Sequence, residues 1–151
     1  MTKSNIKKLT SSAKVFINTE LIVLQAVADG TKPTALIPDI FEEEVKESGL
    51  YYQKNSFGIL MVAKSKEKLD EISNLTIRFD ELHKELGIKL GYPLTAVQAF
   101  VGKIKSKDDD AIPIEYQCFF SFSQDHFADE IKVIDQWYKS AKKKFDAEMR
   151  P

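Results

Sequence analysis

The sequence has one cysteine, Cys118, two histidines and no long uninterrupted hydrophobic run. A single cysteine cannot form an internal disulfide, so we expect a reducing, cytoplasmic compartment. No stretch approaches the roughly 18 apolar residues of a membrane-spanning helix. The N-terminal stretch MTKSNIKKLTSSAK is polar and lacks the apolar core of a secretory signal. We therefore expect no membrane among the partners of this chain.

The chain also lacks an excess of charge of either sign. It holds 22 Lys and Arg against 23 Asp and Glu, which gives a formal net charge of -1. This balance argues against general binding to polyanions, so a nucleic-acid partner is not expected. With 151 residues, 43% of them hydrophobic and 30% charged, the chain has the size and composition of one globular domain covering residues 1–151.

The most specific structural signal is the stretch from Phe79 to Phe100. Apolar residues at helical spacing predict a core-facing stripe, which consists of Phe79, Leu82, Leu86 and Leu90. Gly91 suits the left-handed position after a helix, and Pro93 suits the first turn of the next one. The sequence therefore predicts an αα-hairpin with its corner at Gly91-Tyr92-Pro93, in which Leu90 and Phe100 face each other.

Before this corner the pattern predicts helices and two strands. Residues 6–28 have helical spacing, but the run VFIN leaves open whether they form one helix or a strand followed by a helix. The segment around Pro33 and Pro38 is predicted to be a turn-rich crossing, and Asp39 is predicted to cap a helix over 40–47. Strands are predicted over 50–53 and 57–63, the second in the middle of the sheet because it is apolar on both faces. A long helix is predicted over 66–90.

After the corner, residues 114–122 alternate between apolar and polar side chains, which predicts a half-buried strand. Ser123 or Asp125 is then expected to cap a final amphipathic helix. Its predicted core stripe consists of Phe127, Ile131, Ile134, Trp137 or Tyr138, Ala141 and Phe145. The whole pattern predicts an α+β fold with about three antiparallel strands and helices on one face. Free sheet edges would permit pairing with a second copy, so a homodimer is one expected form of self-association.

Few residues suggest catalysis. The only candidates near the corner are His83, Asp80 and Tyr92, in which the aspartate would orient the histidine as a general base. Cys118 is expected in the core, where a thiol is unreactive. The histidines lack the spacing of a zinc site, and no glycine-rich loop precedes a lysine as a phosphate site requires, so we expect no metal and no cofactor.

The corner also invites comparison with a helix-turn-helix. Its second helix, however, offers Pro93, Leu94, Thr95, Gln98 and Ala99 at the end that would meet base edges, and no positive charge precedes Lys103. A hairpin packed in the core explains the pattern better than a DNA-binding motif does.

Two blocks resemble a group of small bacterial domains of uncharacterised function. The first block runs from Gly87 to Pro93 and continues with Val97 and Phe100, which is similar to Gly-x-x-Leu-Gly-Tyr-Pro-x-x-x-Val-x-x-Phe. The second is Lys32-Pro33-Thr34-Ala35-Leu36. His83 stands four residues before the glycine, whereas the pattern has its histidine three residues before. The resemblance implies a bacterial-type cytoplasmic domain and no particular reaction.

These observations lead to one main functional hypothesis and two alternatives. The main hypothesis is a non-enzymatic module that binds a protein partner or associates with itself. The first alternative is a small enzyme with a site near His83, Asp80 and Tyr92. The second is nucleic-acid binding through the corner.

Overall fold

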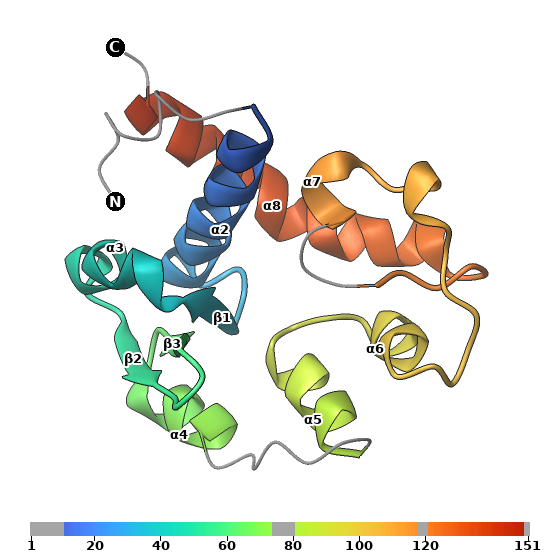
Figure 1. Ribbon diagram of the computed structural model, residues 1–151, viewed down its shortest axis with the longest axis horizontal. Coiled ribbons are helices and arrows are strands. Elements are labelled where there is room, and N and C mark those ends of the chain that lie inside the picture. The colour runs from blue at the N-terminus through green and yellow to red at the C-terminus, as the bar shows by residue number, and fades with distance from the viewer. Residues whose placement is uncertain (1–10, 74–80, 118–120, 150–151) are drawn as a thin grey trace.

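A computed structural model describes residues 11–73, 81–117 and 121–149 of the chain (Figure 1). The elements in chain order are α2 (Ser11–Asp29), β1 (Thr34–Pro38), η1 (Asp39–Phe41), α3 (Glu42–Ser48), β2 (Tyr51–Lys54), β3 (Ile59–Ala63), α4 (Lys66–Ser73), α5 (Glu81–Lys89), α6 (Leu94–Phe100), η2 (Asp109–Ala111), α7 (Ile114–Gln117) and α8 (Phe127–Met149). Here η denotes a 3-10 helix. This composition confirms the predicted α+β class.

The sheet has three antiparallel strands in the order β1-β3-β2. β1 runs along β3 from the pair Thr34 and Ala63 to the pair Pro38 and Ile59. The apolar strand β3 therefore lies in the centre, as its sequence predicted. The antiparallel pairing is confirmed as well.

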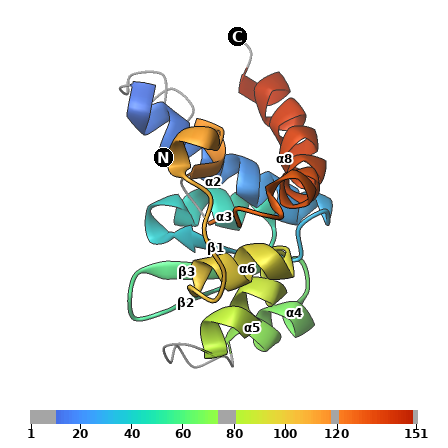
Figure 2. The ribbon, with the colours of Figure 1, turned by 90° about the vertical axis from the view of Figure 1, so that its right-hand side faces the viewer.

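Helices cover both faces of the sheet, whereas the sequence predicted helices on one face only. Figures 1 and 2 show α2 and α8 on one side of the sheet and α4 on the other. Ile37, Leu60 and Val62 face the main core, which α2 and α8 complete. On the opposite face, Met61 and Ala63 pack against Leu69 and Ile72 of α4 and Leu86 of α5.

The two longest helices follow their predicted patterns. Residues 11–29 form one helix, so the alternative of a strand at VFIN is wrong. In α8 the predicted stripe is buried at Ile134, Trp137, Tyr138, Ala141 and Phe145. Ser123 accepts a hydrogen bond from the His126 backbone N–H at 3.1 Å in the turn before α8, but the helix begins at Phe127, so neither Ser123 nor Asp125 directly precedes it as predicted.

The strand predicted over 114–122 is wrong. Residues 114–117 form the short helix α7, and the backbone N–H of Tyr116 donates to the carbonyl of Pro113 at 2.9 Å. Proline fixes its own φ at a helix-compatible value, so Pro113 favours a turn here over the extended backbone that the alternation suggested. Cys118, predicted to lie on this strand in the core, falls outside the described residues.

The third strand is instead β1, in the segment predicted to be a turn-rich crossing. Pro33 precedes β1 and Pro38 is its last residue. Proline cannot donate to a strand ladder, but it is tolerated at the ends of an edge strand. Both prolines occupy such positions, so they delimit the strand and do not prevent it.

The single long helix predicted over 66–90 is also wrong. The Lys89 Nζ lies 3.3 Å from the Glu71 carboxylate. Residues 18 positions apart in one straight helix would be separated by about 27 Å along its axis. The chain must therefore turn back between the described helices α4 and α5.

The corner after α5 has the predicted backbone but a different contact. Gly91 has φ +92°, as predicted for the residue that ends the helix. The helices α5 and α6 approach through Gly87, where an added β-carbon would lie 2.8 Å from Val97. Leu90 is buried as predicted, whereas Phe100, expected to face it across the hairpin, is 59% exposed.

We expect Gly91→Ala to destabilise the protein more than Gly102→Ala does. Both glycines have positive φ, but a β-carbon at Gly91 would lie 2.7 Å from Pro33, whereas Gly102 has no such neighbour within 4 Å. The backbone penalty of about 1–2 kcal/mol is common to both variants, so the difference reports the contact with Pro33. In urea melts, Gly91→Ala should lose at least about 1 kcal/mol more unfolding free energy than Gly102→Ala does. Equal losses would show that the corner does not depend on this close approach.

Candidate functional site

The structure describes only part of the predicted catalytic group. Tyr92 follows α5 and packs against the main core. His83 belongs to α5, but its side chain lies outside the described residues, as does the whole of Asp80. Whether these three residues form a site stays a prediction.

The residue that the structure places beside Tyr92 is Lys32. Its side chain is 1% exposed, and its Nζ donates to the carbonyl of Thr34 at 2.6 Å and to the carbonyl of Leu90 at 2.5 Å. The same nitrogen lies 4.7 Å from the centre of the Tyr92 ring and 5.8 Å from that of Trp137. We call Lys32, Tyr92, Trp137 and Glu20 of α2 the Lys32 cluster.

Local backbone geometry explains why a lysine enters the core here. α2 ends at Asp29 and is followed by Gly30, which has φ +80°, and the backbone N–H groups of Thr31 and Lys32 both donate to the Ala26 carbonyl. The last carbonyls of a helix have no partner within the helix and need donors from elsewhere. Lys32 supplies such a donor to Leu90 at the end of α5.

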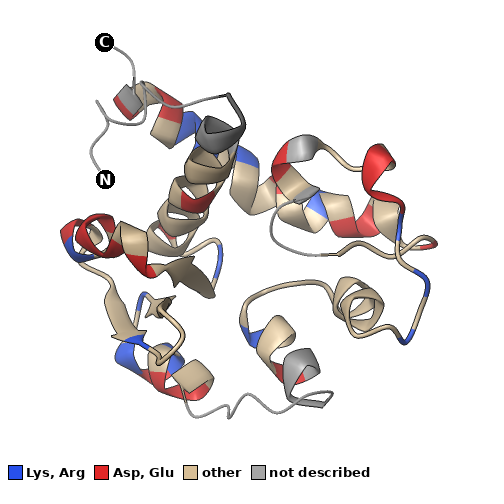
Figure 3. Ribbon diagram, viewed as in Figure 1, with Lys and Arg blue, Asp and Glu red and all other residues tan. Residues whose placement is uncertain are grey.

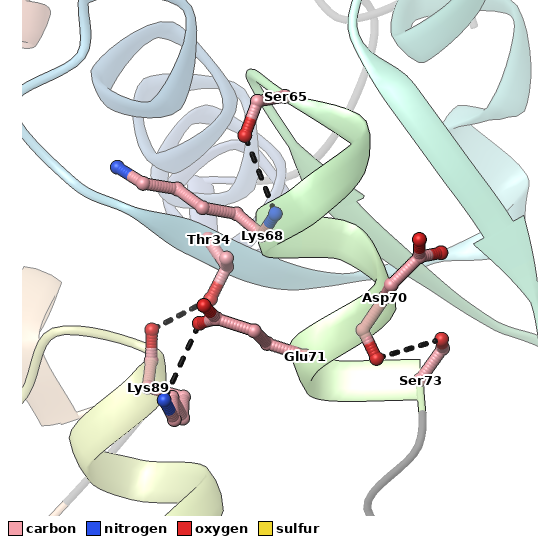
Figure 4. A network of polar contacts seen from close by, with 7 residues as sticks. All are labelled: Thr34, Ser65, Lys68, Asp70, Glu71, Ser73 and Lys89. Atoms are coloured by element: carbon pink, nitrogen blue, oxygen red, sulfur yellow. Dashed lines mark hydrogen bonds and ion pairs between the residues drawn. The ribbon is translucent and has the colours of Figure 1, made fainter.

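A second set of contacts holds the same helix end. The hydroxyl of Thr34 donates to the Lys89 carbonyl at 2.9 Å, and the ammonium of Lys89 donates to Glu71 of α4 at 3.3 Å (Figure 4). The end of α5 is thus attached to β1 and to α4. The two sequence blocks that resemble a bacterial group, 32–36 and 87–93, meet at this point.

Burial changes the acid–base properties of the Lys32 cluster. Burial lowers the pKa of Lys32 to about 7, and the negative charge of Glu20 opposes this shift. Burial raises the pKa of Glu20 to about 7, and Lys32 opposes that shift in turn. Burial raises the pKa of Tyr92 as well, and Glu20 adds to the effect because a second negative charge nearby is unfavourable.

The arrangement suits a structural role better than a catalytic one. An ammonium has three N–H donors, and Lys32 directs two of them to carbonyl oxygens while two aromatic rings flank the nitrogen. At 1% exposure the amine is closed to a substrate from solution. We conclude that the Lys32 cluster joins α5 to the rest of the fold.

A second buried carboxylate joins α6 to α8. Glu130 is 1% exposed and accepts hydrogen bonds from the hydroxyls of Thr95 and Ser123, both at 2.5 Å. It also accepts from the backbone N–H of Ser123 at 2.7 Å. In α6, Thr95 and the buried Ala99 therefore face the interior and not a solvent-exposed recognition surface.

The most exposed apolar side chains near the sheet lie at the β2–β3 turn. Phe57 in this turn is 76% exposed, and Ile40 in η1 is 55% exposed. The Asp39 backbone N–H donates to the Gly58 carbonyl at 3.0 Å, which brings η1 against the turn. We call Asp39, Ile40, Glu43, Lys54 and Phe57 the hairpin-tip surface.

Several hydrogen bonds fix the shape of the turn. The side-chain oxygen of Asn55 accepts from the backbone N–H groups of Phe57 at 2.9 Å and Ile59 at 3.0 Å. The Asn55 backbone N–H donates to the Ile59 carbonyl at 2.9 Å. Phe57 is thus exposed on a well-bonded turn.

Charged groups surround the two apolar side chains. Asp39, predicted to cap the following helix, makes no capping bond and instead forms an ion pair with Lys54 at 3.2 Å. Glu43 is exposed three residues after Ile40, a spacing that puts the two side chains on the same face of a helical turn. Figure 3 shows the acidic character of α3.

Local sequence patterns predict neither the burial of Lys32 nor the exposure of Phe57. Lys32 follows Gly30-Thr31 and precedes Pro33 in a polar turn, where a lysine is ordinarily solvated, and its burial depends on distant partners such as Leu90. Phe57 was assigned to the central strand because the apolar run begins there, but β3 starts two residues later, at Ile59. The Asn55–Gly58 turn was the available signal for its exposure.

We expect the pH dependence of stability to reveal the partly buried carboxyl of Glu20. Because the pKa of Glu20 is raised to about 7 in the folded protein, its stabilising contribution is full below its unfolded value of 4.5 and is lost as the pH rises through 7. The difference in unfolding free energy between the parent and Glu20→Gln should therefore fall as the pH rises between these values. Removing Glu20 also lowers the pKa of Lys32 further, because the negative charge of Glu20 raises it in the parent. This second effect also makes the difference in unfolding free energy fall as the pH rises. Urea melts across this range would contradict the assignment if the difference stayed constant.

The described residues contain neither a cluster of metal-binding side chains nor a helix suited to cross a membrane. Within residues 11–73, 81–117 and 121–149, no three His, Cys, Asp or Glu side chains converge as metal ligands would. No helix in these ranges combines the length and the apolar character needed to cross a membrane.

Comparisons with protein-family models, with curated proteins and with solved structures gave no match. The bacterial group suggested by the two sequence blocks therefore stays a prediction.

Proposed function

We propose that this chain is a non-enzymatic protein-binding module that engages its partner through the hairpin-tip surface. The observation that carries the proposal is the 76% exposure of Phe57 on a well-bonded turn; Ile40, which follows the residue that bonds to Gly58 of this turn, is 55% exposed. Single exposed apolar side chains are common, but neighbouring ones on an ordered surface are typical of interaction sites.

The geometry of the turn favours binding. A backbone turn that is already ordered by hydrogen bonds loses less conformational freedom on association, and this raises affinity for a given contact area. Phe57 extends from a turn in which four hydrogen bonds are made to or from Asn55. Aromatic anchors of this kind often supply much of the binding energy of an interface.

Side-chain binding is supported better than pairing through a sheet edge. β1 is preceded by Pro33 and ends at Pro38, and neither proline has a backbone N–H to donate. β2 has four residues and ends with Lys54. Short edges that carry prolines or lysines are poor templates for another strand.

The compartment and the origin of the chain belong to the same proposal. A reducing cytoplasmic location is supported by the presence of one cysteine, and a bacterial origin by the two sequence blocks. Both follow from sequence alone.

A photo-crosslinking amino acid at position 57 should capture a protein in the cells of origin, because Phe57 would lie in the contact. The matched control carries the same group at position 88, since Ile88 is 47% exposed on α5, outside the hairpin-tip surface. A discrete crosslinked species that appears with position 57 and not with position 88 is the expected result. Equal crosslinking at both positions, or none at position 57, would contradict the proposal.

A further inference from the structure

We draw no further inference here: the strongest candidate, the side-chain cluster of Lys32 and Glu20 where the end of α5 meets β1, belongs to the site already described, and its use as a pH-sensitive device would rest on shifted pKa values alone.

Discussion

The buried ammonium of Lys32 joins segments that are far apart in the sequence. It donates to carbonyls at the start of β1 and at the end of α5, and it lies between the rings of Tyr92 and Trp137. Burying a charge costs several kcal/mol unless polar partners offset it. Those partners are present, so Lys32 holds α5 against the sheet and α8. Glu130 of α8 holds α6 in place by accepting a hydrogen bond from Thr95.

This arrangement separates the parts of the molecule that maintain the fold from the part that we propose to bind. The polar groups near the corner are turned inward, including Thr95 and Lys32. At the β2–β3 turn, by contrast, an apolar side chain points to solvent. Asn55 accepts hydrogen bonds from the backbone N–H groups of the turn, and the Phe57 side chain stays exposed. A rigid turn with an unburied aromatic side chain adds little to the stability of an isolated chain, which is why we relate it to association.

Sequence reasoning succeeded where the pattern is local and periodic. The stripe of α8, the apolar strand β3 and the left-handed Gly91 follow from neighbours within a few residues. It failed where distant contacts decide the structure. β1 is a strand because β3 pairs with it, and α5 turns back on α4, which the continuous helical spacing of the sequence concealed. The burial of Lys32 depends on Leu90, 58 residues away, and no local pattern contains that information.

Native-state hydrogen exchange on the parent and on Lys32→Met tests the central role of the ammonium most directly. In the parent, we predict that amides of α5 and α6 open with the same free energy as those of β1 and β3. Lys32→Met keeps the apolar stem but leaves the carbonyls of Thr34 and Leu90 without this donor, so the opening free energy of α5 and α6 should fall below that of the sheet by about 2–5 kcal/mol. Lys68→Met, on the exposed side of α4, is the control and should preserve the parent pattern. If Lys32→Met left the two regions equally protected, the ammonium would not be what holds α5 and α6 in place.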